Sequence, residues 1–551
     1  MLKIDKNFKI NPFTPQVNKN KTDVGLGIFY TNDMHGDIER ISNFKTAHDE
    51  FKRTNADIPK LTLASGDCLF GTNKKFNSFI IKIFNKMHLD ALSLGNHEFA
   101  GGSKNLSELL AKANFKSFSA NIDVNKQSPL HRRIKDKKIV KSATFMRDGH
   151  KFGIIGVSPF DSYISVIDKA IKVHSIDDTI KSINKEAKKL EKKGIDKIIL
   201  CSHIGYGENG DLKIARETEG VDIIIGGHSH TIIDGINKTD GENNHKLNLL
   251  LSKRKEPVLV TQVGCLNKYV GYLNAIFDDK GILKPEKSIN KLIDINKFKE
   301  SSFVNKLKEE FFGQKSLLAK VKGKYIPKNI YEERYLENPL ANCLADSFLW
   351  FGKKYGAQTA IFHSASVRGG LSDGSITNYQ VKFSMIPFNN ELKLVEITEK
   401  DLVNILKNTS GALLTKKEDA QLLRCAGMKY TINTDKEYYL NGGKNPIKNL
   451  TINKHNINVE NPSNRKIKVV MTDYMFSLPA TKDILDKYKK SAKKIGNEQD
   501  IFIDYLKYKK LINLTSNENR IEFTYKYSSA DELRKAKSEI INALTINLNK
   551  N

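Results

Sequence analysis

Two histidines one residue apart, His228 and His230, end the segment Gly-Gly-His-Ser-His at residues 226–230. The run before them, residues 221–225, is largely apolar and is expected to form a buried strand. Imidazole nitrogens bind divalent metal ions, so a pair of histidines at the end of a strand could hold metal. Residues two apart on a strand also point to the same side, so the same pair could lie on a surface without any ligand. The pair alone leaves both interpretations open.

Four other segments share this plan, in which an apolar strand is followed by side chains that can bind metal. The expected strands cover residues 27–30, 61–64, 91–94 and 195–201. The side chains that follow them are Asp33, His35, Asp67, Asn96 and His203. Because ligands gather at the carboxyl ends of the strands in an α/β sheet, we expect these side chains to meet at such an edge.

The combination of carboxylate, amide and imidazole groups restricts the chemistry of this edge. Such mixed ligands suit Mn, Zn, Fe or Co, whereas cages of oxygen alone suit Mg or Ca and thiolates suit structural Zn. No pair among the five cysteines has the spacing of a zinc site. A carboxylate such as Asp67 can bridge two ions, which together hold the attacking and leaving oxygens of a phosphoryl displacement. The pattern therefore predicts a hydrolytic metal centre.

The order of the motifs resembles that of the calcineurin-like metallophosphoesterases, and the two-domain layout is similar to that of the 5'-nucleotidase family. The motifs are Asp-x-His at 33–35, Gly-Asp at 66–67, Gly-Asn-His-Glu at 95–98, Ser-His at 202–203 and Gly-His-Ser-His at 227–230. The resemblance implies two divalent metal ions, with Asp67 as the bridge between them. One ion would bind Asp33, His35, Asp67 and His230, and the other would bind Asp67, Asn96, His203 and His228.

The same resemblance makes His97 and Asn96 the catalytic residues. His97 would stabilise the transferring phosphoryl group or protonate the departing oxygen. The family usually continues this motif with Phe-Asp, and the aspartate orients the histidine, whereas this chain has Ala100. Loss of the orienting carboxylate should lower the catalytic rate more than it weakens metal binding, unless Glu98 or Asp37 takes over its role.

The second half of the chain is similar to the substrate-binding domain of the family. Arg368, which ends a Ser-Ala-Ser-Val-Arg segment in place of the Gly-rich loop, is the candidate to bind the anionic end of the substrate. Phe388 and Tyr474 are the candidates to stack on a nucleobase from two sides. Leu478-Pro479-Ala480 replaces the usual Gly-Gly-Asp. The missing carboxylate would hold sugar hydroxyls, a contact worth about 1.5–3 kcal/mol, so its absence could weaken or redirect substrate choice.

Alternating strand and helix patterns predict the fold class and the domains. Residues 25–295 are expected to form an α/β four-layer metallophosphoesterase sandwich, and residues 325–526 an α+β substrate-binding domain. A helix is expected in the linker at 296–324, where Lys and Glu follow a helical period between 297 and 318. Residues 1–24 are expected to be extended or disordered, and 527–551 to form a helix or tail.

Composition limits the partners. The 551 residues include 90 lysines and arginines against 63 aspartates and glutamates, a net charge of +27. These charges are spread along the chain with no block of about five or six like charges, so nucleic-acid binding is not expected as the main role. A basic surface could instead attract anionic nucleotides. The sequence shows no signal peptide or membrane span, which predicts a cytoplasmic protein unless an unconventional signal exports it; the oligomeric state is not predicted.

Three functions remain open at this stage. The first is a two-metal nucleotidase that releases phosphate from nucleoside 5'-monophosphates or related nucleotides. The second is a 2',3'-cyclic-nucleotide 2'-phosphodiesterase with 3'-nucleotidase activity. The third is a nucleotide-binding protein in which hydrolysis has decayed with the change at Ala100.

Overall fold

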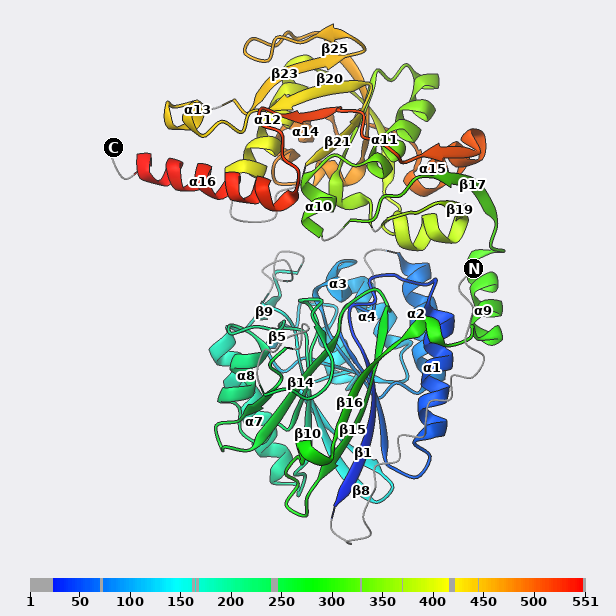
Figure 1. Cartoon of the computed structure of the whole chain (residues 1–551), viewed down its shortest axis with the longest axis vertical. Coiled ribbons are helices and arrows are strands. Elements are labelled where there is room, and N and C mark those ends of the chain that lie inside the picture. Colours follow the sequence, from blue (N-terminus) through cyan, green and yellow to red (C-terminus); the bar gives the residue numbers. More distant parts are fainter. Residues whose placement is uncertain are drawn as a thin grey trace. The chain divides into compact units, whose positions relative to one another are not determined.

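The computed structural model describes residues 23–69, 73–160, 164, 168–238, 246–327, 330–368, 370–415, 422–443 and 445–548 (Figure 1). The chain divides into two compact units, and the division in the sequence falls between Gln314 and Lys315. This division precedes the boundary near residue 325 that we expected from the sequence. The expected N-terminal segment lies outside the described residues up to position 22, and its last residue, Val24, already begins strand β1.

The N-terminal unit contains two mixed sheets of seven strands each. The first sheet has the order β16 (Ile289–Asp294), β15 (Tyr269–Phe277), β1 (Val24–Thr31), β2 (Lys60–Ser65), β3 (Ala91–Ser93), β4 (Lys116–Phe118) and β6 (Ile139–Val140). The second has the order β12 (Ile232–Ile233), β14 (Pro257–Val263), β11 (Ile223–Ile225), β10 (Ile198–Ser202), β8 (His150–Val157) and β7 (Ser142–Arg147), with β13 (Leu249–Leu251) beside β14. Strands β1 to β4 are parallel to one another, as are β8, β10, β11 and β14.

The two sheets pack face to face between helices. One hydrophobic cluster joins apolar side chains of both sheets, for example Ile28 and Leu63 of the first with Ile199 and Ile223 of the second. Helices α1 (Ile41–Thr54) and α2 (Lys74–Met87) lie on one side of this pair, and α7 (Ile176–Glu191) and α8 (Asp211–Glu217) lie on the other (Figure 1). The observed layers confirm the α/β sandwich expected from the sequence.

Helix α7 illustrates how local sequence produces these layers. The hydroxyl of Ser175 accepts a hydrogen bond from the amide of Asp178 and caps the first turn, where acidic side chains favour the helix dipole. Apolar side chains then recur at helical spacing and are buried against the second sheet at Ile180, Ile183, Ala187 and Leu190.

The linker differs from the expected single helix. Helix α9 covers only Ser302–Phe312, and Gly313, with φ of 78°, follows its last turn. Residues Leu317–Lys322 form strand β17 instead, because they pair with β19 (Gly374–Thr377) and β27 (Leu511–Asn513). Their pairing partners are distant in the sequence, so the helical period of the linker could not reveal this strand.

The C-terminal unit is an α+β domain. Its main sheet has the order β21 (Leu423–Ala426), β18 (Thr359–His363), β25 (Lys466–Thr472), β20 (Glu391–Thr398) and β26 (Lys493–Asn497). A second sheet has the order β24 (His455–Asn456), β23 (Ile447–Ile452), β22 (Met428–Ile432) and β28 (Ile521–Phe523). The main helices are α11 (Pro339–Gly352), α12 (Glu399–Thr415), α15 (Glu498–Lys509) and α16 (Ala530–Leu548).

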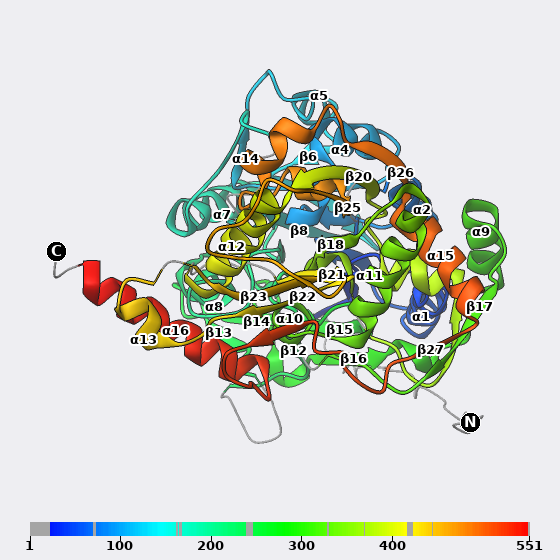
Figure 2. The same ribbon diagram turned by 90° about the horizontal axis from the view of Figure 1, so that it is seen from above.

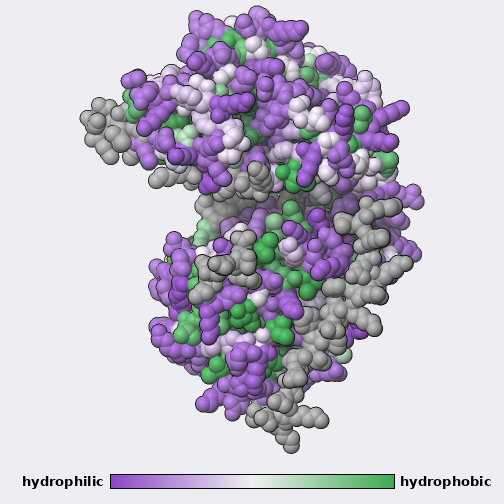
Figure 3. Space-filling view, in the orientation of Figure 1, coloured by the Kyte–Doolittle hydropathy of each residue, from purple (hydrophilic) through white to green (hydrophobic). Residues whose placement is uncertain are grey.

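Helix α16 accounts for the apolar pattern of the tail. It lies beside α12 and α13 (Lys436–Leu440), and its Leu533 and Ile540 are buried in the core of the unit (Figure 2). Hydrophilic side chains dominate the face of the molecule drawn in Figure 3, as the charge of the chain leads one to expect. No helix within the described ranges has the length and apolar character needed to cross a membrane.

Candidate metal centre

The ligand-type residues follow the carboxyl ends of parallel strands and share an unusual backbone. Strands β1, β2, β3, β10 and β11 end directly before the segments that carry them. Five of the seven candidate metal ligands have φ between 44° and 70°, the left-handed region: Asp33, His35, Asp67, His228 and His230. Such conformations are uncommon outside glycine, and they persist where surrounding contacts hold them, often at functional sites.

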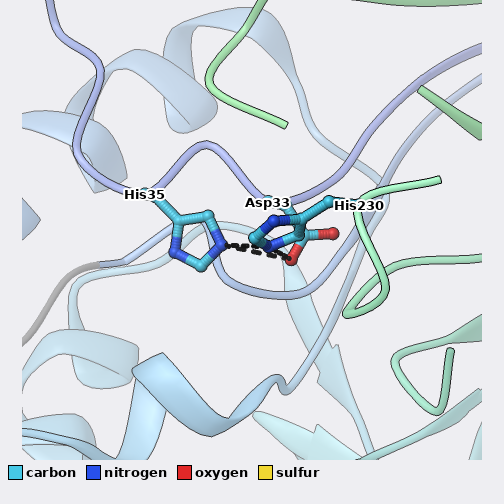
Figure 4. Close-up of side chains that lie close together, drawn as sticks. All are labelled: Asp33, His35 and His230. Atoms are coloured by element: carbon cyan, nitrogen blue, oxygen red, sulfur yellow. Dashed lines mark hydrogen bonds and ion pairs between the residues drawn. The ribbon is translucent and has the colours of Figure 1, made fainter. Parts of the chain in front are cut away.

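The two carboxylate oxygens of Asp33 make different contacts: one accepts hydrogen bonds that hold the loops, and the other faces two imidazoles. Its Oδ2 accepts hydrogen bonds from the side-chain amide of Asn32 at 2.7 Å and from the backbone amide of His228 at 2.8 Å. Its Oδ1 is buried and makes no hydrogen bond with any residue that the structure describes. The Nε2 atoms of His35 and His230 each lie 3.3 Å from that oxygen (Figure 4). One oxygen and two nitrogens thus converge on a common space, which suits a cation.

Asp67 lies at the centre of the cluster. Its Oδ1 accepts a hydrogen bond from the backbone amide of His97 at 2.9 Å. Its Oδ2 is 3.2 Å from Nε2 of His203 and 3.8 Å from Nε2 of His35. Asp67 therefore touches groups on both sides of the cluster, as a bridging ligand would.

His203 is fully buried and its ring is fixed from behind. Its Nδ1 lies 2.6 Å from the carbonyl oxygen of Ser65, which leaves Nε2 to face the two carboxylates. This arrangement selects the tautomer that can bind metal through Nε2. Burial lowers the pKa of His203, but Asp67 and Asp33 outweigh it and raise the pKa to about 10. The field at this position therefore favours a positive charge.

His228 and Asn96 complete the group. Nδ1 of His228 lies 3.2 Å from Oδ1 of Asn96, and its ring packs edge-on against His203 with centroids 5.3 Å apart. Glycine precedes this histidine because a Cβ at Gly227 would lie only 2.4 Å from the carbonyl oxygen of Ser65. The tight approach of the loop to strand β2 thus requires glycine.

Three sets of side chains have ligand atoms within 4.8 Å of one another. They are Asp33 with His35 and His230, Asp33 with Asp67 and His203, and His35 with Asp67 and His97. The structure thus collects the side chains that the motifs single out, from five separate loops. The donor set fits divalent metal ions of the kind expected from the sequence.

Glu98 does not face His97, although the sequence made it a candidate to replace the missing aspartate. Its Oε2 accepts hydrogen bonds from the amides of Asp67 and Gly95, and its Oε1 accepts from Cys68 and Leu69, at 2.8–2.9 Å. Burial and the nearby Asp67 raise the pKa of Glu98 to about 7. The other candidate, Asp37, forms an ion pair with Arg40. The contacts described for both carboxylates therefore serve the loops.

In the C-terminal unit, the candidate substrate residues form a cluster of their own. The guanidinium of Arg368 lies 5.5 Å from the ring centroid of Phe388. Tyr474 is 41% exposed, and its ring packs on His363 with centroids 4.4 Å apart. Burial raises the pKa of Tyr474, while the nearby Arg368 and Arg334 oppose this rise, which places a basic group next to the aromatic surface.

His363 also belongs to this cluster, because its ring packs on that of Tyr474. Its Nδ1 is 3.1 Å from the hydroxyl of Ser366, and burial together with Arg368 and Arg334 lowers the pKa of the imidazole to about 3. The ring is therefore neutral at pH 7. Its position directly before the loop that ends at Arg368 was the available signal.

The two mixed sheets, with carboxylates and imidazoles collected beyond their carboxyl ends, define a metallophosphoesterase. Residues 27–231 match the calcineurin-like phosphoesterase family, and residues 318–478 match the 5'-nucleotidase C-terminal domain. The chain belongs to the 5'-nucleotidase family and is a metal-dependent phosphoesterase of that family. The resemblance inferred from the motifs is thereby confirmed.

Individual proteins show the same relationship. Snake venom 5'-nucleotidase of Crotalus adamanteus is 28% identical over 417 residues, which cover 68% of each chain. The trifunctional nucleotide phosphoesterase protein YfkN of Bacillus subtilis is 28% identical over 445 residues, which cover 74% of this chain but only 29% of that protein. The crystal structure of a 5'-nucleotidase precursor from Thermus thermophilus superposes with a TM-score of 0.67, at 24% identity, over 92% of this chain and 100% of that one. This superposition confirms the fold.

Proposed function

We propose that this protein is a dinuclear-metal-dependent nucleotidase that releases phosphate from nucleoside 5'-monophosphates or related nucleotides. The observation that carries the proposal is that the two oxygens of Asp33, and likewise those of Asp67, make different kinds of contact. In each carboxylate one oxygen is held by backbone amides and the other faces imidazole nitrogens at 3.2–3.3 Å. The snake venom relatives, whose names describe 5'-nucleotidases, support this substrate class.

The proposed ligand assignment is the one that the family resemblance implies. Asp33, His35, Asp67 and His230 would hold one metal ion, and Asp67, Asn96, His203 and His228 would hold the other. Bound ions of this kind lower the pKa of a coordinated water and neutralise charge on the phosphoryl oxygens. The mixture of nitrogen and oxygen donors favours Mn, Zn, Fe or Co.

His97 is the proposed acid or phosphoryl-binding group. Its Nε2 is 4.0 Å from Oδ2 of Asp67, and its side chain is 21% exposed at the margin of the buried cluster. A group in this position can reach a substrate while its backbone amide keeps Asp67 in place. Asn96, one residue earlier, holds its side-chain oxygen near His228 and is proposed to bind metal and assist the same step.

The aromatic and basic cluster of the C-terminal unit is the proposed nucleotide-recognition site. Phe388 and Tyr474 provide aromatic surface for a base, and Arg368 provides a forked cation for an anionic group. A second candidate function is a 2',3'-cyclic-nucleotide 2'-phosphodiesterase with 3'-nucleotidase activity. It is favoured by the similarity to a protein named as a trifunctional nucleotide phosphoesterase.

A phosphate-release panel tests these alternatives. Protein treated with EDTA is dialysed, supplied with Mn²⁺ or Zn²⁺, and incubated with 5'-, 3'- or 2',3'-cyclic nucleotides, with products separated by chromatography. We expect metal-dependent release of phosphate, strongest from 5'-monophosphates. Conversion of the cyclic substrates would favour the second function, and nucleotide binding without release would favour a protein whose hydrolysis has decayed. Asp67→Asn should abolish release while the protein still folds.

A further inference from the structure

The loop that carries His228 and His230 crosses the end of a single strand. It leaves β11 and enters β12, and both of these strands pair with β14, which lies between them. The amide of Gly226 donates to the carbonyl oxygen of Thr261 at 2.7 Å, and the amide of Gly264 donates to that of Thr231 at 3.0 Å. Backbone bonds to β14 and the residues that follow it thus fix both ends of the loop.

The side chain of Gln262, on β14, lies beneath this loop and is fully buried. Its Nε2 donates a hydrogen bond to the carbonyl oxygen of Gly227 at 2.7 Å. Its Oε1 accepts from the backbone amide of Thr231, and from the hydroxyl of Ser229 at 3.2 Å. One carboxamide therefore contacts three alternate residues of the loop.

The two residues between these contacts are the candidate metal ligands. His228 and His230 have φ of 70° and 55°, and their rings approach Asn96 and Asp33. Ser229 also accepts a hydrogen bond from the amide of Tyr206 at 3.0 Å, so its side chain faces away from the metal cluster. The strained backbone needs such support, because a free chain would relax from the left-handed region.

We propose that Gln262 is a positioning residue, which holds His228 and His230 in ligand geometry before any metal binds. It acts through its hydrogen bonds to the backbone of the loop and to the hydroxyl of Ser229, and not as a ligand. The inference rests on the dinuclear centre proposed above. It extends that centre to a residue that lies 32 positions beyond the last ligand and outside every motif quoted from the sequence.

Metal titration of three variants tests the proposal. Gln262→Met keeps the volume of the side chain but removes all three hydrogen bonds, and Gln262→Glu keeps an acceptor for Thr231 but loses the donor to Gly227. Thr261→Val is the matched control. Thr261 is buried on the same strand, and its hydroxyl makes three hydrogen bonds, to Tyr30, Ile233 and Asn290, none of them to the ligand loop.

Protein treated with EDTA is titrated with Mn²⁺ by isothermal titration calorimetry, and folding is followed by circular dichroism. We expect Gln262→Met to raise the Kd for Mn²⁺ about 10- to 100-fold, with Gln262→Glu between it and the wild type and Thr261→Val unchanged. Saturating Mn²⁺ should restore kcat in both Gln262 variants. An unchanged Kd in folded Gln262→Met and Gln262→Glu, with or without a lower Tm, would overturn the proposal; if Gln262→Met does not fold, Gln262→Glu decides alone. Failure of the wild-type protein to bind Mn²⁺ would instead contradict the metal centre itself.

Discussion

Replacement of Glu98 by glutamine should damage the metal centre without removing a ligand. Each carboxylate oxygen of Glu98 accepts from two backbone amides, so four N–H groups depend on this one side chain. A carboxamide keeps one acceptor oxygen but turns an NH₂ group toward the other two donors. Two buried N–H groups then lose their partner, at about 1–3 kcal/mol each, which predicts a loss of about 2–6 kcal/mol in the free energy of unfolding.

The size of this loss can be judged against the whole protein, since domains are typically stable by only about 5–15 kcal/mol. Three of the four amides belong to the turn that carries Asp67, and the fourth, that of Gly95, precedes Asn96, so Glu98→Gln should also weaken metal binding about 10- to 100-fold. Urea denaturation followed by tyrosine and tryptophan fluorescence measures the first effect, and titration with Mn²⁺ measures the second.

Glu186→Gln is a suitable control, because it removes the same charge from another buried glutamate of the N-terminal unit. Glu186 bonds to Ser142 and to Lys189, a lysine whose side chain is 55% exposed, and it touches no candidate ligand. If Glu98→Gln lost no more stability than Glu186→Gln and bound Mn²⁺ like the wild type, the assigned role of the four amide contacts would be wrong.

Three other changes have defined outcomes. Ala100→Asp should raise kcat with little change in the Kd for metal if the missing carboxylate limits His97, and steady-state kinetics on the best substrate of the panel would show it; an unchanged kcat would contradict that account. Tyr474→Ala should raise KM with little change in kcat, because a base–aromatic contact is worth about 1–3 kcal/mol, whereas an equal fall of kcat would argue against a stacking role. Burial raises the pKa of Glu498 from 4.5 to about 8, so the folded protein holds this proton more tightly than the unfolded chain, and stability should be greatest below about pH 4.5 and fall up to about pH 8. Glu498→Gln should flatten that part of the curve of Tm against pH, and an identical curve would refute the assignment.

The candidate metal centre could be located from the sequence because each ligand leaves a local trace. Asp33, Asp67 and His203 each lie within two residues of the end of a buried, largely apolar strand, and parallel strands deliver their carboxyl ends to one edge. The backbone contacts that hold these ligands leave no such trace. Ser65 contributes only a carbonyl oxygen to His203, which any residue type could supply. Gln262 contacts the loop of His228 and His230 from the neighbouring strand β14, so its spacing in the sequence does not predict this role.

The features that the sequence did not predict correctly depend on contacts between residues far apart in the chain or on burial. The linker was expected to be helical, yet Leu317–Lys322 form a strand because β27 supplies a partner from near the end of the chain. Glu98 was a plausible orienter of His97 by proximity in sequence, whereas the fold turns its side chain toward the amides of the neighbouring Asp67 loop. His363 joins the candidate substrate residues because β18 ends with its ring packed on that of Tyr474, a contact between residues far apart in the sequence.

The left-handed backbone at five ligand positions also limits how this centre can change its metal. Aspartate and histidine are among the few residue types other than glycine that enter this region with some frequency, so the candidate metal ligands also suit the turn. A designer who exchanges His230 for cysteine to favour a thiophilic ion alters coordination and backbone preference together. A substitution at one of these five positions would therefore change the metal preference and the loop conformation together. Substitutions of Asn96 and His203, which lie outside the left-handed set, would change the donor atoms with less effect on the backbone.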